Sequence, residues 1–214
     1  MRLLELFRGT KSVGKVAEAM GWEVVSVDIN PLFDPTIVTD ILNWDYTVFK
    51  PSFFDLAHAS PPCTMFSIAR SKGQRDFAQA DAIARKTLEI IAYLKPKWFT
   101  IENPFKSLIW RREYAHLSPL TLDYCRYSTV EEGFGYRKRS KFWTNVPFDV
   151  RLCHGDCENM EADRIHHRRV AQHGARKQYP KHTFSTEDLY RIPPRLCFEI
   201  LRACEVADCE LRSR

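Results

Sequence analysis

The order of elements over residues 1–28 limits the fold of this chain more than any other feature of its sequence. Residues 3–7 are predicted to form a short strand, and residues 8–14 form a turn that carries Gly9 and Gly14. Apolar residues then follow at helical spacing over 16–20, and a second hydrophobic run ends in the carboxylate of Asp28. A strand, a turn, a helix and a second strand with a terminal acid make up the unit with which open α/β sheets bind adenosine-containing cofactors.

The remainder of the chain repeats this alternation. Further strands are predicted over residues 36–39, 53–58, 98–101 and 121–125, and helices over Phe77–Leu94 and 194–206. The pattern predicts an α/β fold with a mostly parallel, doubly wound sheet. Regular patterning stops near Pro147, so we divide the chain into a main domain (1–147), a basic Cys/His-rich insert (148–187) and a C-terminal segment that packs back on the main domain (188–214).

Composition limits the class of protein. A chain of 214 residues with 44% hydrophobic residues can build one core. The sequence has no apolar run of roughly 20 residues and no secretory signal pattern, so we expect no membrane partner. We expect the protein in the cytoplasm, in the nucleus if the source is a eukaryote, or in the host cytoplasm if it is a phage or virus. Seven cysteines then indicate reduced thiols, metal ligands or a nucleophile rather than a disulfide framework.

Positive charge is concentrated in one part of the chain. The net charge is +5, and residues 164–186 contain no acidic residue. Six cations of this segment could bind phosphates, or could simply keep a surface loop solvated; they are Arg164, Arg168, Arg169, Arg176, Lys177 and Lys181.

Two other segments carry residues suited to chemistry. The prolines of residues 59–67 stiffen a loop that presents Cys63 directly after a hydrophobic strand, as a nucleophile requires, although a free cysteine is also a common buried apolar residue. Glu102 ends the next predicted strand, where parallel neighbours would bring its carboxylate near Cys63. Cations of residues 135–145 could steady an anionic substrate or the thiolate.

The spacing of these residues resembles the cytosine-5 DNA methyltransferase family, especially its compact phage- and virus-type members. The resemblance covers residues 1 to about 145 and rests on residues 6–9, Asp28, residues 40–41, Pro61-Pro62-Cys63, residues 102–103 and residues 139–141. It implies a Rossmann-like fold that uses S-adenosylmethionine and methylates carbon 5 of cytosine. The family's long target-recognition region is missing here, and residues 189–196 look like a shortened form of its closing segment.

The resemblance also implies roles for single residues. Cys63 would add to carbon 6 of the cytosine ring, Glu102 would protonate nitrogen 3, and Arg139 would support the pocket. The cofactor site would be lined by Phe7, Gly9, Thr10, Gly14, Asp28, Ile29, Asp40, Ile41 and Pro62. On the local pattern alone, the turn between Gly9 and Gly14 is not a dinucleotide fingerprint and could be a routine connection between a strand and a helix. The carboxylate of Asp28 could accept hydrogen bonds from ribose hydroxyls.

A cluster of cysteine and histidine in the insert is a candidate zinc site. Cys153 and Cys157 are followed by His166, His167 and His173, so two cysteines and one or two histidines could bind zinc, with ordinary loop thiols as the alternative. If zinc binds, it would order a small insert in place of the missing recognition region. The four other cysteines are expected to pack in apolar or terminal settings; they are Cys125, Cys197, Cys204 and Cys209.

Three classes of function fit these patterns. The first is a DNA cytosine methyltransferase acting as a monomer, the second a methyltransferase for RNA or a pyrimidine nucleotide, and the third a nucleic-acid-binding module without turnover. The third is disfavoured because Cys63, Glu102 and Arg139 occur together, a set that binding alone does not need.

Overall fold

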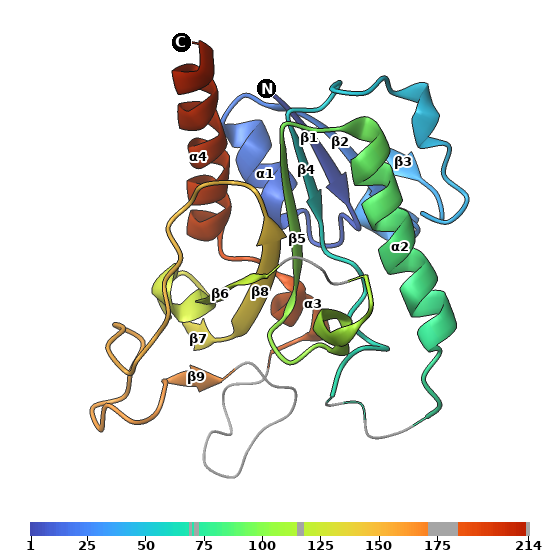
Figure 1. The fold of residues 1–214 in the computed structure, drawn as a ribbon. Coiled ribbons are helices and arrows are strands. Elements are labelled where there is room, and N and C mark those ends of the chain that lie inside the picture. Colours follow the sequence, from blue (N-terminus) through green and yellow to red (C-terminus); the bar gives the residue numbers. More distant parts are fainter. Residues whose placement is uncertain (69, 71–72, 115–117, 171–183, 213–214) are drawn as a thin grey trace.

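The computed structural model describes residues 1–68, 70, 73–114, 118–170 and 184–212. A seven-stranded sheet in the order β3-β2-β1-β4-β5-β8-β6 forms the centre of this part (Figure 1). Its parallel strands are β1 (Arg2–Leu6), β2 (Glu23–Asp28), β3 (Ile37–Val38), β4 (Leu56–Ala59) and β5 (Trp98–Pro104). Strand β8 (Arg139–Thr144) lies between β5 and β6 (Leu120–Asp123) and runs antiparallel to both.

Helices cover the two faces of this sheet. Helices α1 (Ser12–Ala19) and α4 (Pro194–Arg212) lie on one side, and α2 (Phe77–Leu94) lies on the other (Figure 1). The alternation of side chains along the strands produces two cores, because Leu3 and Leu56 pack toward α1 and α4 whereas Leu4 and Ala57 pack toward α2. This confirms the predicted α/β fold with a mostly parallel sheet covered on both faces.

Short elements complete the described part. The 3₁₀ turns are η1 (Pro31–Phe33), η2 (Tyr46–Val48), η3 (Leu108–Arg111) and η4 (Tyr124–Arg126). Helix α3 (Thr186–Tyr190) begins with a capping box at Ser185 and Asp188, and β7 (Tyr136–Arg137) pairs in parallel with β9 (Arg169–Val170). None of the described helices is long and apolar enough to span a bilayer.

Most predicted elements form where the sequence placed them. The strand predicted over 53–58 begins later, at Leu56, where pairing with Leu3 of β1 and Trp98 of β5 starts. The prediction for residues 135–145 missed a strand, β8, since it treated this segment only as a source of cations. The last helix continues to Arg212, beyond the predicted end at 206.

Candidate active site

A cavity of about 600 Å³ opens at the carboxyl ends of β1, β2, β4 and β5. This is where open α/β sheets bind ligands, and the volume falls in the usual range of small-molecule sites. Cys63 and Glu102 both line it. So do all the predicted cofactor residues except Gly14: Phe7, Gly9, Thr10, Asp28, Ile29, Asp40, Ile41 and Pro62. The predicted chemical residues and the predicted cofactor residues therefore share one cavity.

Asp28 holds the cofactor side of the cavity together. One carboxylate oxygen accepts from the backbone N–H of Gly9 at 2.9 Å, and the other accepts from that of Asn30 at 2.8 Å. Gly9 has a φ of 46°, a left-handed conformation that glycine adopts without steric cost. The carboxylate at the end of β2 thus fixes the turn that follows β1, which explains why the sequence pairs a glycine turn with a terminal acid.

Glu5 is a cavity residue that the sequence prediction missed. It is buried on β1, and its Oε1 accepts from the N–H groups of Val13 and Gly14 at 3.2 and 3.0 Å. Its Oε2 has no hydrogen-bond partner within the described residues. Burial raises the pKa of Glu5 to about 7, against the opposing effect of the two N–H donors. A glutamate inside the hydrophobic run of residues 3–7 was the available signal.

Gly14 does not line the cavity but makes room for Glu5. A β-carbon at this position would lie 2.4 Å from Glu5 Oε2, closer than any real contact. The second glycine of the turn therefore lets helix α1 begin directly against the buried carboxyl group.

Cys63 lies on the loop after β4, and the loop is tied to β5. The side-chain amide of Asn103 donates to the carbonyl of Pro61 at 2.8 Å, and the carbonyl of Cys63 accepts from the N–H of Phe66 at 3.0 Å. Burial raises the pKa of the Cys63 thiol, and the charge of Glu102 raises it further, while Lys138 opposes both. Burial and the charge of Glu102 thus favour the protonated thiol, whereas the positive charge of Lys138 favours its thiolate.

Glu102 is buried near the end of β5, the strand that pairs in parallel with β4. The hydroxyl of Tyr124 donates to Glu102 Oε1 at 3.0 Å. Burial and the charge of Glu102 raise the pKa of Tyr124 well above its ordinary value, so this hydroxyl keeps its proton. Tyr124 was missed because nothing in its local sequence links it to β5.

Arg139 does not line the cavity that holds Cys63 and Glu102. Its guanidinium donates to both carboxylate oxygens of Asp123, at 2.9 and 2.7 Å, in the antiparallel register of β6 and β8. It lines a second cavity, with Cys153 and His167, whereas the preceding residue, Lys138, lines the first. The cation that the structure brings to Cys63 is Lys138.

Two further groups complete the wall. His58, on β4, is buried between Thr100 Oγ1 at 2.7 Å and Ser60 Oγ at 3.2 Å, and burial lowers its pKa to about 4, so the ring is neutral near pH 7. The C-terminal segment contributes Leu189, Tyr190 and Ile192. Lys138 Nζ donates to the carbonyl of Leu189 at 2.7 Å, which joins this segment to the cavity wall beside Cys63.

The predicted metal ligands separate into two groups. Cys153, Cys157 and His167 lie together with Cys125, which the sequence prediction had assigned to packing. His166 lies elsewhere, with its ring exposed and paired to Asp163 at 2.7 Å. His173 lies outside the described residues.

The described part of the basic segment makes contacts within the protein. Arg168 Nε donates to the carbonyl of Met160 at 3.2 Å, and Arg169 lies over the ring of Phe184. Arg176, Lys177 and Lys181 lie outside the described residues.

Comparison with known proteins defines the family. A family model described as C-5 cytosine-specific DNA methylase matches residues 29–117, and the chain belongs to this family. A relative from Frog virus 3 (isolate Goorha), named "Probable DNA (cytosine-5)-methyltransferase", is 39% identical over 227 residues, which cover 95% of this chain and 100% of the relative.

Solved structures are similar at lower identity. The Dnmt2 methyltransferase of S. pombe has 16% identity and a TM-score of 0.48 over 71% of this chain and 51% of that one. A DNMT2 mutant from Spodoptera frugiperda has 18% identity and a TM-score of 0.47 over 72% of this chain and 53% of that one. The match thus spans about half the length of these solved chains.

Proposed function

We propose that this chain transfers a methyl group from S-adenosylmethionine to carbon 5 of cytosine in DNA, through a covalent bond between Cys63 and carbon 6. The observation that carries the proposal is the single cavity that holds Cys63 and Glu102 at one end and the Asp28 turn at the other. Membership of the family and the named viral relative support the same reaction and substrate.

The cavity fits the proposed cofactor chemically. Phe7, Ile29 and Ile41 offer apolar surface for an adenosine, and Asp28 would accept from ribose hydroxyls with Asp40 near the adenine amine. The unpartnered Glu5 Oε2 is a buried polar atom of this cavity, suited to an acceptor of the ligand while the carboxyl group is protonated and to a donor once it is ionised. When bound, S-adenosylmethionine supplies an electrophilic methyl group on a sulfonium.

The residues around Cys63 make carbon 5 reactive. Carbon 5 of cytosine is too weak a nucleophile by itself. The Cys63 thiol gives its proton to the Glu102 carboxylate, which passes it to nitrogen 3 as the thiolate adds to carbon 6, and the ring becomes enamine-like. After methyl transfer, a base such as water takes the carbon 5 proton, the nitrogen 3 proton returns to Glu102, and the carbon–sulfur bond breaks, which restores the ring and the thiolate. In a duplex the base must leave the stack to reach Cys63.

The remaining features of the proposal concern setting and organisation. That the protein acts as a monomer stays a prediction. None of the cysteines in the described residues forms a disulfide, which supports a reducing compartment, namely the cytoplasm, nucleus or host cytoplasm. The division at 147 and 187 and the supporting role of Arg139 in the pocket stay predictions.

Covalent trapping tests the mechanism. DNA that contains 5-fluorocytosine should form a stable adduct in the presence of S-adenosylmethionine, because fluorine replaces the proton that must leave carbon 5. Cys63→Ser should abolish the adduct and methyl transfer while cofactor binding persists. Cys209→Ser, at an exposed cysteine on α4, is the matched control and should trap like the wild type.

The result that refutes the proposal is equally specific. An adduct mapped to a cysteine other than Cys63, or methylation by Cys63→Ser at the wild-type rate, would overturn the proposed mechanism. Labelled methyl groups appearing in RNA but not in DNA would overturn the proposed substrate.

A further inference from the structure

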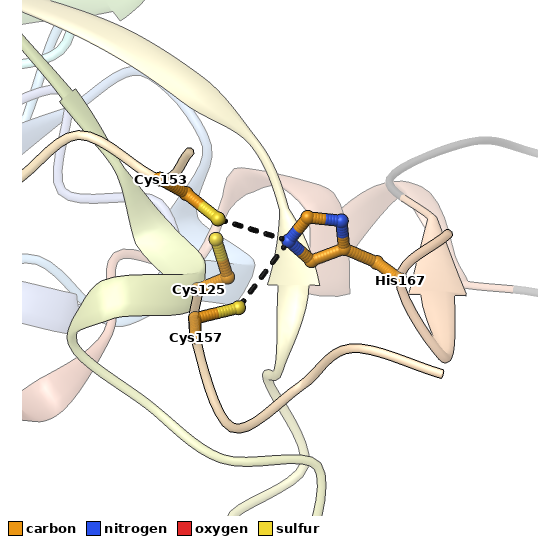
Figure 2. Close-up of side chains that lie close together, drawn as sticks. All are labelled: Cys125, Cys153, Cys157 and His167. Carbon is orange, nitrogen blue, oxygen red and sulfur yellow. Dashed lines mark hydrogen bonds between the residues drawn. The ribbon is translucent and has the colours of Figure 1, made fainter. Parts of the chain in front are cut away.

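Four potential metal ligands from distant parts of the chain converge at the base of η4. Cys125 belongs to η4, Cys153 and Cys157 come from the loop after β8, and His167 precedes β9 (Figure 2). All four are buried, and their ligand atoms lie within 4.8 Å of one another. Figure 2 shows the three sulfur atoms and His167 Nε2 facing a common centre.

The distances fit a shared cation better than hydrogen bonds. His167 Nε2 lies 3.4 Å from the sulfur of Cys153 and 3.4 Å from that of Cys157. A single ring nitrogen carries either one hydrogen or one lone pair, so it can bond only one of two thiols. A tetrahedral zinc ion, with bonds of about 2.3 Å to sulfur and 2.0–2.1 Å to nitrogen, separates sulfur from nitrogen by roughly 3.6 Å.

We propose that Cys125, Cys153, Cys157 and His167 bind one Zn²⁺ as a closed structural site. A Cys₃His set supplies four protein ligands and leaves no open position, which is the arrangement of structural rather than catalytic zinc. Thiolates select zinc over the hard cations magnesium and calcium.

A disulfide does not account for this cluster. It could join only two of the three cysteines, and it would leave the third cysteine and His167 outside the bond.

Zinc would replace a hydrophobic core in this region. Among the residues that the structure describes, the buried cluster here consists of Cys125, Cys153, Cys157 and Met160, too few apolar groups to fix a loop by themselves. A metal contributes that missing folding energy. The inference goes beyond the proposed methyl transfer, because it assigns a metal site that the reaction does not use.

The site would also act on the substrate side of the cavity. Cys125 directly follows Tyr124, whose hydroxyl donates to Glu102. The N–H of Cys153 donates to Asp123 Oδ2 at 2.9 Å, and the same oxygen accepts from Arg139. Zinc would therefore fix η4 and hold the donor to Glu102 in place.

The decisive measurement is the metal content of full-length protein purified without a histidine tag. Wild-type protein should contain about one zinc per chain by mass spectrometry of its metals, and replacement by Co²⁺ should give the visible and thiolate charge-transfer bands of a tetrahedral thiolate site. His167→Asn and Cys125→Ser should lose most of the bound metal. The matched controls His166→Asn and Cys209→Ser should retain it, because His166 pairs with Asp163 and Cys209 lies on α4.

Two results would overturn the proposal. One is wild-type protein that contains no zinc and shows no thiolate band with Co²⁺, a result that does not depend on the folding of any variant. The other is loss of metal from His166→Asn with retention in His167→Asn. Neither measurement depends on methyl transfer, so failure of the zinc site and failure of the proposed function are distinguishable.

Discussion

Glu5→Gln tests whether the buried carboxyl group in the cavity is protonated at moderate pH. Its pKa is raised by burial from an ordinary value of 4.5 to about 7. Between pH 4.5 and 7 the unfolded chain has released this proton, whereas the folded chain still holds it. The contribution of Glu5 to the free energy of unfolding is therefore complete below pH 4.5 and is lost as the pH rises through 7. At about 1.4 kcal/mol for each pH unit, the loss is about 3 kcal/mol.

The Glu5→Gln variant should not show this fall in the free energy of unfolding. Glutamine keeps the oxygen that accepts hydrogen bonds from the N–H groups of Val13 and Gly14, and it has no titrating proton to release. The free energy of unfolding in urea, measured from pH 4.5 to 8, should therefore fall by about 3 kcal/mol more in the wild type than in Glu5→Gln. Glu210→Gln, at an exposed position of α4, should follow the wild type. Parallel curves for wild type and Glu5→Gln would refute the assignment.

Three further changes test the site. Tyr124→Phe removes the hydrogen-bond donor to Glu102. The loss of a hydrogen bond to a charged group costs about 1.5–3 kcal/mol, so the methylation rate should fall about 10- to 100-fold, while the cofactor affinity measured by calorimetry should not change. An unchanged rate would exclude this contact from catalysis. Gly14→Ala should weaken S-adenosylmethionine binding in the same assay, because its β-carbon displaces the Glu5 carboxyl group, and unchanged affinity would contradict this. Charge reversal should be made in the basic segment at Arg168, Arg169, Arg176 and Lys177. It should lower the affinity for all DNA sequences and reduce the slope of log affinity against log salt concentration by about 0.9 for each lost phosphate contact. An unchanged slope would indicate a solvated loop.

The parallel half of the sheet could be predicted because its signals are local. Hydrophobic runs separated by a glycine turn and a helix fixed β1, α1 and β2 in the sequence, and the carboxylate of Asp28 marked the strand end. The nearness of Cys63 and Glu102 followed from topology, since consecutive parallel strands end at the same edge.

The residues that sequence analysis missed are those whose partners lie far along the chain. Glu5 looks like an interruption of a strand until Gly14 is placed beside it, and Cys125 looks like a packing residue until the insert folds back on η4. Arg139 lies in β8, an antiparallel strand that was not predicted, and its position depends on the pairing of this strand with Asp123 in β6. In each case the cause is register or tertiary contact, which local pattern does not encode.

The antiparallel strands explain why the support of Glu102 depends on η4. Strand β8 separates β5 from β6, and Phe142 of β8 pairs with both Glu102 and Leu120, so even the residue of β6 opposite Glu102 is two strand spacings away, about 9.6 Å. Only a long side chain can donate across that distance, and Tyr124 does so from the first position of η4. Phenylalanine would fill the same space without the donor. Any movement of η4 would therefore be transmitted to the Glu102 carboxylate. Cys125 occupies the next position in η4, and zinc bound there would limit that movement.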